Sequence, residues 1–240
     1  MTTEANARKS PAARRLLVVH KHFPHRERQS STRVVGWPAV AQLGFLSGLV
    51  ATGASLAFMI ASLPVLLADV GTPWANILTL VPSLILAPAL LTVLVCLHHT
   101  VSLEKQIWSN LSVAFGTVYV ALVSVVYVVQ LAVLEPLVVR GEEERLVELL
   151  SIEPGGVLNA VDGLGYAFLC TALFVLVPVF QQGGRDKLIR LLLFANGAAV
   201  VPILLTYFVD RIFLLVTGPV WGIAIPAVSG LLAVRFRAQH

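Results

Sequence analysis

Residues 74–97 read WANILTLVPSLILAPALLTVLVCL and contain no charged side chain. A helix needs about 20 apolar residues to cross a hydrocarbon core about 30 Å thick, and this stretch is long enough. A membrane-spanning strand would instead alternate between apolar and polar residues, which this stretch does not do. The stretch therefore predicts a transmembrane helix.

The rest of the chain repeats this pattern. It is 57% hydrophobic and only 12% charged, with a mean hydropathy of +0.85, whereas a soluble domain has about 25% charged residues. This composition excludes an ordinary soluble enzyme, a disordered chain and a disulfide-stapled secreted domain. The expected fold class is an all-α polytopic membrane protein, with a transmembrane domain over 37–235 and tails at 1–36 and 236–240. Its six transmembrane helices are expected at 38–68, 74–97, 107–134, 156–180, 188–208 and 211–234.

The positions of lysine and arginine predict the orientation of these helices. If the N-terminus is cytoplasmic, 14 of the 17 basic residues lie on the cytoplasmic side, as the positive-inside rule requires. Both termini are therefore expected to be cytoplasmic. The tail at 1–36 carries eight bases and two acids, and we expect it to lie near anionic lipid of the bilayer. Nucleic-acid binding is not expected, because no fold or aromatic pattern in the tail supports it.

One outer loop is long enough to hold structure of its own. Three glutamates at 142–144 would occupy a first helical turn, where the helix dipole favours anions. Apolar residues follow on one side, and Pro154 ends the segment. We expect a short amphipathic helix at about 142–151 that rests at the outer interface. It is either a solvated cap of the bundle or a surface for a partner.

A polar cluster is predicted between the third and fourth expected helices. Asp162 is the ionisable residue that lies well inside a span, and Asn159 and Tyr166 share its helix face. Tyr127 and Gln130 lie at the same membrane depth on the preceding span. Intramembrane ionisable groups are costly, so they are usually paired or functional. The five residues predict an outer-leaflet polar pocket centred on Asp162.

Two interpretations of this pocket remain open. The cluster is either a hydrogen-bonded contact that fixes helix register, or a binding site of a small transporter. Arg211, at the outer start of the sixth expected helix, is the nearby base that could pair with Asp162.

Two Gly-x-x-x-Gly pairs predict close helix contacts. They are Gly44 with Gly48 and Gly218 with Gly222, in the first and sixth expected helices. Small residues at this spacing let two helices approach closely. The pairs would join these helices to each other or to those of a second copy, so a homodimer is possible.

The sequence offers no support for a cofactor, a metal or an enzymatic reaction. All six histidines lie outside the expected spans, where they cannot be axial ligands of haem held between transmembrane helices. The sequence also lacks the His-Glu-x-x-His, Walker and Gly-x-Ser-x-Gly motifs. We therefore expect no metal, no cofactor and no catalytic residues.

Three segments of the chain resemble a known group of proteins. They are HHTVSLEKQIWSNLSVAFGTVYVALVSVVYVVQL at 98–131, LGYAF at 164–168 and PVF at 178–180. The chain resembles a set of uncharacterised bacterial multispanning membrane proteins, over roughly the second to fifth expected helices. The resemblance implies a multi-pass protein of the bacterial inner membrane and no particular chemistry. We expect a non-enzymatic accessory or sensor-like protein, or alternatively a small transporter or ligand-binding protein that uses Asp162.

Overall fold

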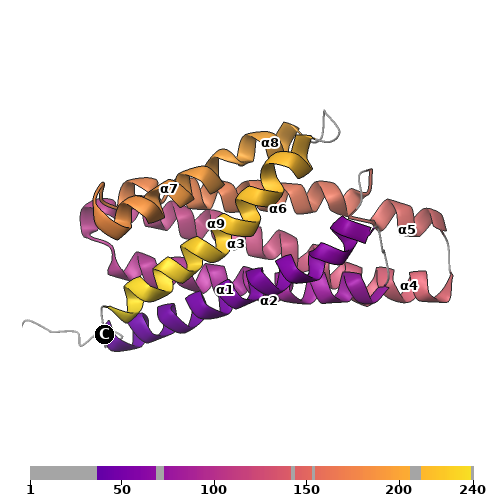
Figure 1. The fold of residues 1–240 in the computed structure, drawn as a ribbon, viewed down its shortest axis with the longest axis horizontal. Helices are drawn as coiled ribbons and strands as arrows, with labels where there is room; N and C mark the ends of the chain where they lie inside the picture. Colours follow the sequence, from indigo (N-terminus) through magenta and orange to yellow (C-terminus); the bar gives the residue numbers. More distant parts are fainter. Residues whose placement is uncertain (1–36, 69–72, 142–143, 153–154, 206–211, 239–240) are drawn as a thin grey trace, which may run out of the picture. The chain divides into compact units, whose positions relative to one another are not determined.

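The computed structural model describes residues 37–68, 73–141, 144–152, 155–205 and 212–238. Within these ranges, side chains are described except those of residues 37, 64–68, 73–76, 144–145 and 212–220. The described part of the chain is helical and contains no strand. Its long helices run alongside one another in Figure 1. The elements are α1 (Trp37–Ala68), α2 (Pro73–Thr100), η1 (Leu103–Lys105), α3 (Gln106–Val129), η2 (Gln130–Leu134), α4 (Glu135–Arg140), α5 (Glu144–Leu150), α6 (Val157–Phe174), η3 (Val177–Val179), α7 (Gly184–Ala198), α8 (Val200–Leu205) and α9 (Ile212–Arg237).

The long helices pack as a closed ring. The main contacts join α1 to α2, α2 to α3, α3 to α6, α6 to α7 and α7 to α9, and α9 packs back against α1. Each helix therefore lies against its neighbours in the sequence, and the last closes on the first. The centre is filled by apolar side chains such as Leu97, Val123, Leu193 and Phe236, each almost wholly buried.

The outer surface of the ring carries many exposed apolar side chains. Ile60, Ile107, Leu191 and Ile223 are each at least 60% exposed. An apolar surface of this extent on a protein in water would drive aggregation. Five helical segments in the described part of the chain are long and apolar enough to cross a membrane. These apolar helices, with apolar side chains on their outer faces, are compatible with a membrane protein.

Several hydroxyl groups in the helices are satisfied within their own helix. The side chains of Thr52, Ser55, Ser83, Thr92 and Thr171 each donate to the carbonyl four residues earlier, at 2.8–3.0 Å. In hydrocarbon no water is present to accept these bonds. At these five positions the hydroxyl group needs no partner on another helix.

The third expected helix is longer than predicted. It was expected to end at 134, but the helical path continues through the π turn η2 into α4 and reaches Arg140. Pro136 lies in the first turn of α4, where its missing N–H is tolerated. The helix ends at Gly141, whose φ of 66° provides a left-handed cap.

The fifth expected helix, at 188–208, is divided in the structure. It begins earlier, at Gly184, and is interrupted at Ala199 between α7 and α8. Pro202 accounts for the interruption, because its ring clashes with the carbonyl four residues earlier and it has no N–H to donate there. Residues 206–208 of the prediction lie outside the described residues.

The fourth expected helix, at 156–180, is shorter in the structure: α6 ends at Phe174, and a 3-10 turn, η3, follows at Val177–Val179. The expected amphipathic helix at about 142–151 corresponds to α5, although 142–143 lie outside the described residues. The sixth expected helix corresponds to α9, whose side chains are described from Trp221 onward. The tail at 1–36 also lies outside the described residues.

Candidate functional site

Asp162 lies in the second turn of α6, on a helix that packs closely against α3. Gly165, one turn later, allows this approach. A Cβ atom at Gly165 would lie 2.9 Å from Cγ1 of Val123 on α3, which is closer than two carbon atoms normally pack. The predicted adjacency of the third and fourth spans is therefore present in the structure, and it brings Asp162 toward α3.

Two of the predicted partners meet directly at this interface. The hydroxyls of Tyr127 on α3 and Tyr166 on α6 form a hydrogen bond of 2.5 Å. The Asp162 carboxylate lies near the Tyr127 hydroxyl. Asp162 and the hydrogen-bonded tyrosine pair therefore form one polar group between α3 and α6. The Oδ1 atom of the Asp162 carboxylate is buried and has no hydrogen-bond partner in the described part of the chain.

Aromatic rings enclose this polar group. Tyr119, two turns before Tyr127 on α3, is 2% exposed, and its ring centroid lies 5.8 Å from that of Tyr166. Trp221 of α9 also packs against Tyr166, with the two ring centroids 4.0 Å apart. Three helices of the ring therefore contribute to the enclosure. We call Asp162, Tyr119, Tyr127, Tyr166 and Trp221 the tyrosine cluster.

Two members of the tyrosine cluster were not among the predicted site residues. Tyr119 could have been found from the sequence, because it lies eight residues before Tyr127 and shares its helix face. Trp221 lies in the middle of the sixth expected span, away from either membrane interface. A tryptophan at this position is expected to pack between helices, but the sequence does not show which helix it meets.

Gln130 has a different role from the one predicted. Its side-chain amide donates to the carbonyl of Leu150 at 2.8 Å, and the residue is buried. The bond attaches the end of α5 to the π turn η2. This hydrogen bond therefore holds the end of α5 against the bundle.

Two residues of the prediction remain, the pocket residue Asn159 and the charge partner Arg211. Asn159 lies half-buried on α6, one turn before Asp162. Arg211, the predicted charge partner of Asp162, lies outside the described residues.

The predicted glycine contacts occur within the chain. A Cβ atom at Gly44 would lie 2.8 Å from the ring of Phe236, and one at Gly48 would lie 2.8 Å from the Cβ of Ala233. Both neighbours are on α9. Gly222 lies opposite Met59 of α1, and the surroundings of Gly218 are not described. Close approach of α1 to α9 therefore depends on these glycines.

Comparison with known proteins gives no functional assignment. No family model, no curated protein and no solved structure matches the chain. Among the described residues, no group of three or more histidine, cysteine, aspartate or glutamate side chains is placed to hold a metal ion. The tyrosine cluster is thus the candidate site that rests on observed geometry, and its chemistry is that of a buried carboxylate with tyrosine hydroxyls.

Proposed function

We propose that the chain is an integral protein of the bacterial inner membrane, with six crossings and both termini in the cytoplasm. Its role is non-enzymatic, as an accessory or sensor-like component. This proposal includes membership of the uncharacterised bacterial multispanning proteins that the sequence resembles. The outward-facing apolar side chains of the ring support insertion into lipid. The charge distribution supports the orientation.

The observation that carries the non-enzymatic proposal is the packing around Asp162. Tyr119 and Tyr127 are 2% and 3% exposed, and the ring of Trp221 covers Tyr166. A polar group enclosed in this way fixes the register of neighbouring membrane helices. A site for turnover would also need a nucleophile with a base, or a metal, within reach of substrate.

A cysteine-labelling experiment tests this interpretation. Asp162→Cys is introduced into a chain in which Cys96 and Cys170 are replaced by alanine, and a membrane-impermeant maleimide is added from outside. Val157→Cys, at the exposed start of α6, is the matched control. A structural contact predicts labelling at 157 and none at 162. Rapid labelling at 162 in a folded protein would contradict it.

One observation favours a second candidate function, a small transporter or ligand-binding protein. The buried Oδ1 atom of Asp162 has no hydrogen-bond partner in the described part of the chain. A carboxylate inside a membrane protein requires a cation, a proton or further donors. Rapid labelling at 162 would support this alternative, because it would place the carboxylate on a hydrated path.

The proposed partners are the bilayer itself and, at the basic tail 1–36, its anionic lipids. A homodimer is also proposed, but Gly44 and Gly48 already face α9 of the same chain. A dimer would therefore use another surface. Chemical cross-linking in native membranes tests this, and a product of monomer mass alone would argue against the dimer.

A further inference from the structure

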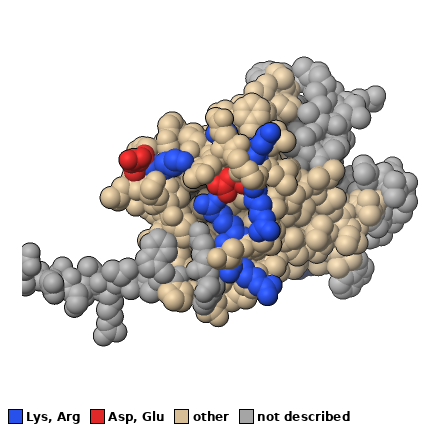
Figure 2. Space-filling model, turned by 60° about the vertical axis from the view of Figure 1, so that its left-hand side comes forward, with Lys and Arg blue, Asp and Glu red and all other residues tan. Residues whose placement is uncertain are grey.

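One end of the helical ring gathers most of the described basic side chains. Helices α2, α3, α7 and α9 each have an end here, at Thr100, Gln106, Gly184 and Arg237 respectively. Figure 2 turns this end forward and shows lysine and arginine side chains gathered on it, with much less acidic surface. We call the basic residues there the basic patch: Lys105, Arg185, Lys187, Arg190, Arg235 and Arg237.

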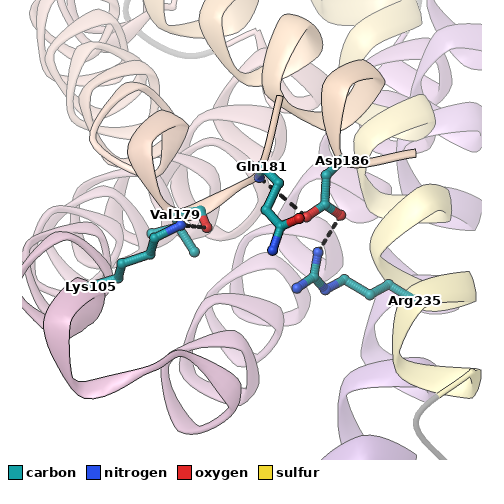
Figure 3. Close-up of polar contacts among 5 residues, drawn as sticks. All are labelled: Lys105, Val179, Gln181, Asp186 and Arg235. Atoms are coloured by element: carbon teal, nitrogen blue, oxygen red, sulfur yellow. Dashed lines mark hydrogen bonds and ion pairs between the residues drawn. The ribbon is translucent and has the colours of Figure 1, made fainter. Parts of the chain in front are cut away.

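The loops that carry the basic patch are fixed to one another (Figure 3). Lys105 donates to the carbonyl of Val179 at 2.9 Å, which joins the start of α3 to the end of the α6 segment. Asp186 accepts from Arg235 of α9 at 2.5 Å and from the backbone N–H of Gln181 at 3.3 Å. Three segments far apart in the sequence are therefore held together, so the positions of the bases are set by the fold.

These contacts leave the basic patch with excess positive charge. The ion pair with Arg235 balances the charge of Asp186, and Lys105 donates to an uncharged carbonyl. In the part of the chain that the structure describes, Arg185, Lys187 and Arg190 form no ion pair. Arg185 and Lys187 are exposed. The patch therefore offers several cations to an anion from outside.

An apolar strip continues from the basic patch along α7. Lys187, Leu191 and Phe194 follow at helical spacing on one face. Leu191 is 62% exposed and Phe194 is 51% exposed. The face thus presents a cation at the helix end, followed by apolar side chains toward the middle of the expected span. This order matches a phospholipid, in which a charged phosphate is followed by an acyl chain.

We propose that the basic patch binds the headgroup of an anionic phospholipid, with an acyl chain lying along Leu191 and Phe194. The phosphate contacts Lys187 and Arg185. This site lies in the folded part of the chain and is separate from the basic tail at 1–36. The inference rests on the proposed insertion of the chain into the membrane.

The test compares two double variants of the full chain. Arg185→Gln/Lys187→Gln removes two positive charges from the basic patch. Arg140→Gln/Arg145→Gln removes two from the region of α4 and α5. Each protein is placed in nanodiscs of equal phosphatidylglycerol and phosphatidylcholine, and the lipids retained on release are counted by native mass spectrometry.

The wild type is expected to retain phosphatidylglycerol in preference to phosphatidylcholine. Each base near an anionic headgroup contributes a factor of roughly five in affinity, so loss of both lowers the preference by about 25-fold. The Arg140→Gln/Arg145→Gln variant keeps the wild-type preference. The charge-conserving variant Arg185→Lys/Lys187→Arg also keeps it, which separates charge from any effect on folding.

Three results would overturn the inference. The first is equal retention of the two lipids by the wild type, and the second is an equal loss of the phosphatidylglycerol preference in the two glutamine variants. The third is displacement of the lipid by millimolar inorganic phosphate, which would identify a soluble anion as the ligand. Failure of the wild type to enter nanodiscs at all would instead contradict the proposed membrane insertion, and the inference with it.

Discussion

The contact between α1 and α9 makes a specific prediction about Gly48→Ala. The new Cβ would lie 2.8 Å from the Cβ of Ala233 and 3.1 Å from both its Cα and the carbonyl oxygen of Ser229. Carbon atoms normally pack at about 3.5–4.0 Å, so α9 must move away by roughly 0.7 Å or more. Two of these three neighbours are backbone atoms, which cannot rotate away as the end of a side chain can.

Gly53→Ala is the matched control on the same helix. Its Cβ would meet no atom within 4 Å. Both changes gain up to about 1 kcal/mol in helix propensity, so the difference between them isolates the clash. Overpacking of this kind costs about 1–3 kcal/mol, which corresponds to a melting temperature roughly 2–12 °C lower for Gly48→Ala than for Gly53→Ala.

Thermal unfolding of the purified protein in detergent, followed by far-UV circular dichroism, measures this difference. Equal melting temperatures for the two variants would refute the reasoning. In that case α1 and α9 would not approach at Gly48 as the structure has them.

Three further predictions follow from polar contacts. Tyr127→Phe and Tyr166→Phe should each lower the free energy of unfolding by about 0.5–1.5 kcal/mol. The double variant should lower it by less than the sum, because the two changes remove the same hydrogen bond. A strictly additive double variant would argue against the bond. Asp186→Asn should lower the free energy of unfolding by about 1 kcal/mol or less, because the ion pair with Arg235 is partly exposed. This loss of stability should be smaller in 1 M salt. A loss that does not depend on salt would point to packing instead. Gln130→Leu should speed hydrogen exchange in α5 while the exchange of α3 stays unchanged, since the bond that holds the end of α5 is lost; unchanged exchange in α5 would show that this bond is dispensable.

The sequence was most informative about where helices run. Lipid requires every backbone group to be satisfied within a helix, so long uncharged stretches such as 74–97 predicted α2 closely. Boundaries at prolines were harder to predict. Pro136 is accommodated in the first turn of α4, after a π turn, whereas Pro202 interrupts the fifth helix. The same residue type acts differently because its effect depends on its place within a helical turn.

The candidate site was predictable in part. The shared face of Asp162 and Tyr166 follows from helical spacing, and the pairing with Tyr127 follows once the third and fourth helices are neighbours. The role of Gln130 was not predictable, because it depends on where α5 folds back. The contact of Trp221 with Tyr166 was also hidden, since it requires α9 to close the ring.

The measurement that most directly tests the central claim is the sidedness of the two ends of the helical ring. Single cysteines at Ser102, Gln182 or Val157 are placed in a chain in which Cys96 and Cys170 are alanine, and intact cells are treated with a membrane-impermeant maleimide. All three positions are exposed in the structure. The account predicts labelling at 157 in intact cells, and labelling at 102 and 182 only after the membrane is permeabilised. Labelling of 102 or 182 in intact cells, or of all three positions alike, would contradict it.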